Sequence, residues 1–104
     1  MTKTELATAL AEVAPTYFLR APKGTAVPYI VYTWNNTPNF PADDVVYQKI
    51  AEIDIEFYFK DLEMLDSVDA ALDELVEYYV SATEYEEDEK LYIKTYTMEV
   101  IDNG

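Results

Sequence analysis

Three carboxylates occupy every second position of one stretch of the chain, at Glu52, Asp54 and Glu56. On a β-strand these side chains would lie on one face at steps of about 6.5–7 Å, twice the rise per residue. Such a row could bind a cation or supply an acid/base pair. The alternative is a solvated outer face, or a face that meets a neighbouring subunit. We favour the alternative, because no glycine-containing calcium-loop spacing surrounds the row and carboxylate pairs arise by chance in so acidic a chain.

A second acidic cluster spans residues 84–89. Its carboxylates could bind calcium, which takes oxygen ligands. A block of like charges repels itself and is usually exposed, so we interpret the cluster as the solvated tip of a hairpin. We therefore predict no metal site in the chain.

Other chemistry is restricted by the residues that the chain lacks. It has no histidine and no cysteine, so the commonest general base near neutral pH, disulfides and zinc–thiolate sites are all excluded. Its two glycines cannot build a phosphate-binding loop. The serines, Ser67 and Ser81, have no histidine to activate them. We predict neither an enzyme nor a bound cofactor.

The carboxylate row lies in a stretch that predicts a strand followed directly by a helix. Residues 51–60 alternate strictly between apolar and polar side chains, which is typical of a half-buried strand. Between Leu62 and Tyr79, apolar residues recur at three- and four-residue steps and form one helical stripe. Asp61 precedes this stripe as a candidate N-cap. Both apolar surfaces are buried most simply if the helix folds back onto the sheet.

The remaining elements complete this pair of layers. A short helix is predicted at residues 4–13, with Thr2 or Thr4 as its cap and Pro15 at its end. Strands are predicted at residues 27–34, 45–60, 80–85 and 90–101, and the longer helix at residues 62–79. The expected fold class is α+β, with one antiparallel or mixed sheet of about four strands and two helices packed mainly on one face. Residues 1–104 are expected to form a single domain.

Composition limits the partners and the environment. The chain has 104 residues and a net charge of −14, so direct binding to the nucleic-acid backbone is disfavoured. No apolar run approaches the ~20 residues that a membrane helix needs, and the first residues lack a signal-peptide pattern. We therefore expect a cytosolic protein that contacts no membrane. The acidic charge either keeps a surface from sticking to nucleic acid or mimics nucleic acid toward a basic partner.

The aromatic composition indicates surfaces that contact other protein chains. The chain has ten tyrosines, which suit half-apolar contact surfaces, and the predicted strands carry apolar residues on both faces. A two-layer domain buries only one sheet face, so we expect another copy of the chain to cover the second. Trp34 and Phe40 bracket a polar loop. We interpret them as a lid on the core, with an anchor for a partner as the alternative.

The order of these segments resembles the tail completion (tail terminator) proteins of long-tailed phages and prophages. The resemblance rests on the segment at residues 28–32, the loop that ends at Asp44, the alternating strand and acidic helix, and the closing tyrosine-rich hairpin. It implies a ring, commonly a hexamer, that caps the tail tube and joins it to the head. The implied partners are the major tail protein and the head-completion or connector proteins. The implied location is the host cytoplasm during assembly and then the head–tail junction of the virion.

This resemblance gives the charged residues expected roles. Glu52, Asp54 and Glu56, or the acidic turn, would face the ring channel or a basic partner, and the channel wall would then repel DNA. The connection at residues 16–24, expected to contain at most a brief extended piece and a turn at Gly24, carries Arg20 and Lys23. These two cations, with Lys49 and Lys94, are candidates for ion pairs between subunits; scattered solubilising charge is the alternative. A different class of function remains open: an acidic DNA mimic that inhibits a basic nucleic-acid-binding protein.

Overall fold

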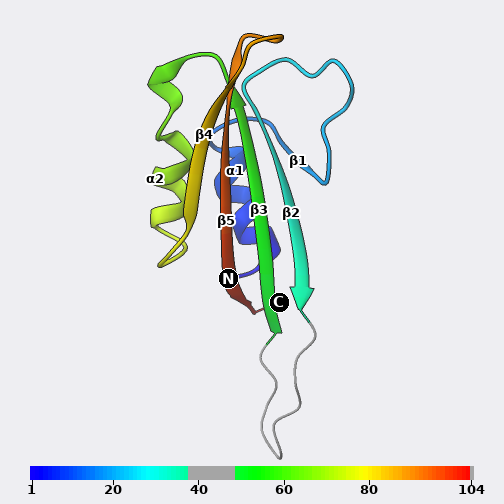
Figure 1. Cartoon of the computed structure of the whole chain (residues 1–104). Helices are drawn as coiled ribbons and strands as arrows, with labels where there is room; N and C mark the ends of the chain where they lie inside the picture. The colour runs from blue at the N-terminus through cyan, green and yellow to red at the C-terminus, as the bar shows by residue number, and fades with distance from the viewer. Residues whose placement is uncertain (38–48, 104) are drawn as a thin grey trace, which may run out of the picture.

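The structure is a computed structural model that describes residues 1–37 and 49–103 (Figure 1). Its elements in chain order are α1 (Lys3–Ala11), β1 (Thr16–Phe18), β2 (Tyr29–Thr37), β3 (Lys49–Phe59), the 3-10 turn η1 (Leu62–Met64), α2 (Ser67–Asp73), β4 (Val80–Glu86) and β5 (Leu91–Asp102). The predicted α+β class is confirmed. The sheet is mixed and has five strands, one more than the prediction of about four.

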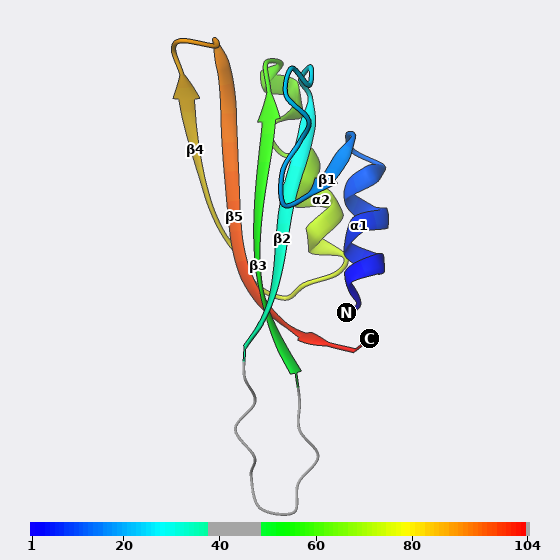
Figure 2. The same cartoon turned by 90° about the vertical axis from the view of Figure 1, so that its right-hand side faces the viewer.

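The strands lie in the order β1-β2-β3-β5-β4. β1 runs parallel to β2, and every other neighbouring pair is antiparallel. Both helices lie on the same side of the sheet, and the other side, here called the open face, carries no helix (Figure 2). β5 lies between β3 and β4, as expected for a strand with apolar residues on both faces.

The alternation in β3 produces the two faces as predicted. Ala51, Ile53, Ile55, Phe57 and Phe59 are all fully buried. The register places Ile53 between Trp34 of β2 and Met98 of β5, so side chains from three strands form one apolar layer. The polar residues between them project from the open face, because successive side chains leave a strand on opposite sides.

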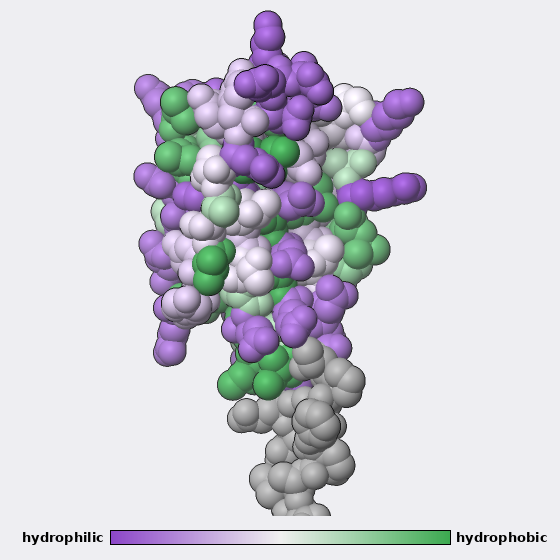
Figure 3. Space-filling view, viewed as in Figure 1, coloured by the Kyte–Doolittle hydropathy of each residue, from purple (hydrophilic) through white to green (hydrophobic). Residues whose placement is uncertain are grey.

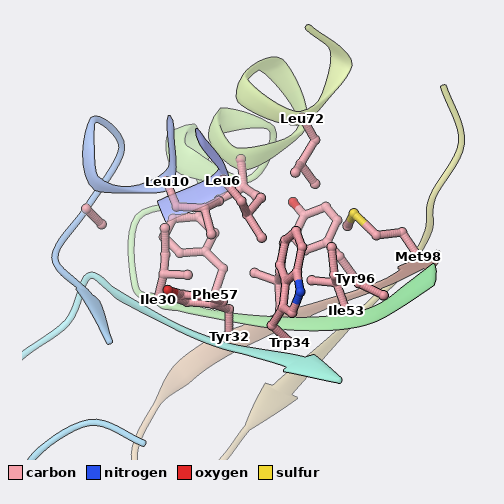
Figure 4. Close-up of a cluster of buried hydrophobic side chains, with 14 of the residues drawn as sticks. Leu6, Leu10, Ile30, Tyr32, Trp34, Ile53, Phe57, Leu72, Tyr96 and Met98 are labelled. Carbon is pink, nitrogen blue, oxygen red and sulfur yellow. The ribbon is translucent and has the colours of Figure 1, made fainter. Parts of the chain in front are cut away.

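The core forms where the helices meet this layer (Figure 4). Leu6 and Leu10 of α1 and Val68 and Leu72 of α2 are fully buried against it. Burial of one such side chain stabilises the fold by about 1.5–3 kcal/mol. α1 begins with a capping box, in which Thr2 accepts a hydrogen bond from the Glu5 amide and Glu5 accepts one from the Thr2 amide. Thr2 is therefore the cap, and not the alternative Thr4.

The second helix is much shorter than the predicted span of residues 62–79. Asp61 accepts a hydrogen bond from the Glu63 amide, but the element that it caps is η1. α2 then ends at Asp73, and no basic residue lies in its last turn. Negative charge at the C-terminal end of a helix opposes the helix dipole. Asp73, Glu74 and Glu77 therefore disfavour continuation, although the apolar stripe runs on to Tyr79.

The edge at β1 contains the brief extended piece expected in the connection at residues 16–24. This piece is the three-residue β1, and its pairing with β2 as a fifth strand of the sheet was not predicted. β2 itself begins and ends later than the predicted strand at residues 27–34. Residues 45–48 of the predicted strand at 45–60, and Phe40, lie outside the described residues.

Candidate functional site

The carboxylate row predicted from the sequence lies on the open face. Glu52, Asp54 and Glu56 are all exposed there. The register sets Asp54 between Thr33 and Thr97, and the hydroxyl of Thr97 donates a hydrogen bond of 3.2 Å to Asp54. Each of the three carboxylates therefore has one neighbour on β2 and one on β5, and each is open to water.

The open face is less apolar than the sequence suggested. Figure 3 shows this side of the molecule, which is mostly hydrophilic or intermediate, with scattered hydrophobic patches. Tyr32, Tyr92 and Tyr96 share register positions with core residues of β3 and so lie on the helix side. The prediction of excess apolar surface is therefore wrong for most of the open face.

Aromatic residues gather at one end of the open face. The rings of Tyr29 and Tyr58 are stacked with their centroids 4.5 Å apart, and Tyr17 meets Tyr29 edge-on at 6.5 Å. The hydroxyl of Tyr58 donates a hydrogen bond of 3.2 Å to Glu56. Burial, and then the negative charge of Glu56, raise the pKa of Tyr58 to about 12. Tyr58 therefore keeps its proton at neutral pH and holds one carboxylate of the row in place.

A cleft beside these tyrosines brings together three of the predicted interaction residues. Arg20 and Lys23, on the loop after β1, line a cleft of about 400 Å³ with Glu56, Tyr58 and Glu89. The loop turns at Gly24, whose φ of +83° is a conformation that glycine adopts without strain. Among the described residues neither cation lies within ion-pair distance of an acid. The cleft is lined by mixed charges and phenol groups, which suits the polar side chains of another protein.

Trp34 belongs to the core. Its side chain is 9% exposed and packs with Ile53 and Met98. The indole Nε1 donates a hydrogen bond of 3.3 Å to Asp102 near the end of β5. This geometry agrees with the interpretation of Trp34 as part of a lid and disagrees with its role as a partner anchor.

Lys94 is not available for a contact between subunits. It is 6% exposed and lies beneath α2, where its ammonium group reaches Asp69 at 2.8 Å, the Leu65 carbonyl at 3.1 Å and Asp66 at 3.5 Å. Its register position lies opposite the core residue Phe57, and the sequence signal for this burial is its two-residue spacing from the core residues Tyr96 and Met98 of the same strand. Lys49, by contrast, is exposed at the start of β3.

β4 covers the strand predicted at residues 80–85, but its exposure on both faces was not predicted. Every residue of the strand except Glu86 is exposed, because no helix lies beneath it and it forms the last strand of the sheet. Val80 and Tyr85 are 55% and 49% exposed, and Tyr78 just before the strand is 73% exposed. The turn at residues 87–90 joins β4 to β5 and contains only the second half of the predicted acidic tip, because Glu84 and Glu86 lie within β4.

No protein family matches the chain, and no curated protein matches it in sequence. Within residues 1–37 and 49–103, no three acidic side chains are grouped closely enough to hold a metal ion. In the same part of the chain no helix has the length and apolar character needed to cross a membrane.

Proposed function

We propose that this chain is a structural protein of a phage or prophage tail, which assembles with copies of itself into a ring at the end of the tail tube and joins the tail to the head. Its partners would be the major tail protein and the head-completion or connector proteins. The proposed location is the host cytoplasm during assembly and the head–tail junction of the finished particle.

The observation that carries the proposal is the unfinished edge of the sheet. β4 is exposed on both faces and carries the apolar side chains of Val80 and Tyr85. An exposed edge strand is a ready template for pairing with another chain, and soluble proteins usually shorten or cover such strands. The seven-residue β4 is uncovered, and this supports a subunit that buries the strand only when it assembles with another chain.

The acidic face supports the same proposal. Glu52, Asp54 and Glu56 project into solvent in one line, and Glu99 of β5 pairs with Glu52 in the register. If this face lined the ring channel, it would repel DNA phosphates and let the genome pass without sticking. A net charge of −14 is consistent with such a wall.

The same row favours a second candidate function. Exposed carboxylates at regular steps along a strand can imitate nucleic-acid phosphates, so the chain would then be an inhibitor of a basic nucleic-acid-binding protein. A mimic of this kind predicts tight binding to a basic nuclease or repressor, with affinity that falls as the salt concentration rises.

Deletion of the coding sequence from the phage or prophage genome tests the proposal. Electron microscopy of the lysate should show filled heads and tails that are not joined, or tails of uncontrolled length. Expression of the intact chain in trans should restore complete particles. Normal virions in the deletion lysate would contradict the proposal.

A further inference from the structure

The two edges of the sheet carry opposite charge. The strand order places β1 at one edge and β4 at the other, so the two lie on opposite sides of the molecule. Because each is a free strand edge with exposed apolar side chains, each has backbone groups and apolar surface to offer a partner. The charges around them differ in sign, and this difference indicates which partner fits.

The edge at β1 is basic. Lys3, Arg20 and Lys23, out of seven cations in the chain, stand beside it. The Nζ of Lys3 lies 3.4 Å from the centre of the Phe18 ring. Phe18 and Leu19 are 41% and 61% exposed. Glu56 and Glu89 line the cleft with Arg20 and Lys23, but in the described part of the chain neither acid forms an ion pair with these cations. We call the surface formed by Lys3, Phe18, Leu19, Arg20 and Lys23 the basic edge.

The edge at β4 is acidic. The chain from the end of α2 to the tip of the hairpin contains no lysine or arginine. Its acids are Asp73, Glu74, Glu77, Glu84, Glu86, Glu87 and Asp88, whereas Glu89 at the tip lines the cleft with Arg20 and Lys23. Three exposed apolar or phenolic side chains, Tyr78, Val80 and Tyr85, lie among them. We call β4 and the acids on either side of it the acidic edge.

This charge distribution selects between the two ways in which identical chains can pair. A two-fold dimer through β4 would place the same patch of both copies face to face, and here would bring acid against acid. A head-to-tail contact would instead place the acidic edge of one copy on the basic edge of the next. Opposite charges then face each other. Each copy uses one edge in a contact and offers its other edge to the next copy, so the contact repeats until a ring closes.

We propose that β4 of one copy docks on the basic edge of the next copy, with Arg20 and Lys23 facing Glu77 and Glu84 across the contact. The proposal rests on the ring function given above and names the surfaces that build the ring. The exposed apolar side chains of both edges are buried in the contact, and the charges set its direction and exclude the two-fold alternative.

Charge reversal tests this pairing in the purified full chain. Arg20→Glu with Lys23→Glu places acids at the proposed contact positions of both edges, and Glu77→Lys with Glu84→Lys places cations at the contact positions of both edges. Each double variant alone should self-associate about tenfold to a hundredfold more weakly than the parent, as measured by native mass spectrometry and sedimentation across a concentration series. Lys60→Glu, an exposed cation after β3, is the matched control and should assemble as the parent does. Circular dichroism confirms that every variant is folded.

Mixing the variants gives the decisive result. An equimolar mixture of the two double variants should form oligomers in which they alternate, and the quadruple variant, with both charges exchanged, should assemble alone. Oligomers of the parent that neither double variant weakens would overturn the edge pairing but leave the ring function standing. A parent chain that stays monomeric at every concentration also overturns the pairing, and the deletion experiment then decides the ring function separately.

Discussion

The ammonium group of Lys94 lies 2.8 Å from a carboxylate oxygen of Asp69, and this contact joins β5 to α2 beneath the surface. The hydroxyl of Tyr96 donates a hydrogen bond to the same oxygen. Burial acts to raise the pKa of Asp69, but the hydrogen bonds from Lys94 and Tyr96 outweigh it and hold the pKa below its usual value. α2 is only seven residues long, so these contacts and two buried apolar residues fix it on the sheet.

Lys94→Ala should therefore destabilise the folded chain strongly. The substitution leaves Asp69 partly buried without its cation, and removal of one partner from a buried pair costs about 3–5 kcal/mol. Because the Asp69 side chain is 25% exposed, we expect a loss nearer ~2–3 kcal/mol in the free energy of unfolding. Urea denaturation measures this loss. Lys60→Ala, an exposed lysine, is the control and should change stability by less than about 0.5 kcal/mol. Equal effects of the two substitutions would contradict the buried pair.

Stability should fall at alkaline pH because of Tyr96. Burial, and then the hydrogen bond to Asp69, raise the pKa of Tyr96 far above the usual value of 10.0. Above pH ~10 the unfolded chain loses this proton while the folded chain keeps it, so the stabilising contribution is complete below pH 10 and decreases above it. Urea titrations between pH 8 and 11 should show a steep loss for the parent and a shallower one for Tyr96→Phe. Tyr78→Phe, at an exposed tyrosine, should keep the slope of the parent. Identical slopes for all three chains would refute the assignment.

Trp34 is the single tryptophan of the chain, so its fluorescence reports whether it is a core residue or a partner anchor. Because Trp34 is 9% exposed, its fluorescence should lie at short wavelength in the folded chain and shift to the red in urea. Self-association at high protein concentration should leave the emission unchanged, because the indole is already buried within one copy. Trp34→Ala should destabilise the chain by about 3–5 kcal/mol. Emission that shifts on assembly but not on unfolding would favour the anchor.

The acidic open face should make stability depend on salt. Exposed carboxylates in a chain of net charge −14 repel one another in the compact state, and salt screens this repulsion. The free energy of unfolding should thus rise between 10 and 500 mM sodium chloride, on the order of 1 kcal/mol. The variant Glu52→Gln, Asp54→Asn, Glu56→Gln should show a smaller rise. An equal rise in the two chains would mean that Glu52, Asp54 and Glu56 do not contribute to this electrostatic repulsion.

The sequence predicted features that depend on local periodicity. The alternation at residues 51–60 identified β3 and its buried face, because burial of one face of a strand repeats every two residues. Asp61, and either Thr2 or Thr4, were predicted as caps for a similar reason, since a cap is decided by residues within one turn. Thr2 is the cap of α1, and Asp61 caps η1. The exposure of the carboxylate row followed directly from the position of β3.

Features that depend on distant contacts were not predicted. The sequence indicated only a brief extended piece at residues 16–24, and its place as a strand of the sheet depends on its pairing with β2. Lys94 resembled a free cation because its partners lie on α2, far away in sequence. The cleft at Arg20 and Lys23 forms only when the loop after β1 folds beside Glu56. The apolar periodicity at residues 62–79 predicted too long a helix, because it continues past the acids that end α2.

The most direct test of the ring account is reconstitution on isolated tail tubes. Tubes purified from a lysate that lacks this protein are incubated with the purified chain and imaged by electron microscopy, then mixed with filled heads. The account predicts a ring of added density at one end of each tube and the formation of joined particles. Bare tube ends and unjoined heads at saturating concentrations of the folded chain would contradict it.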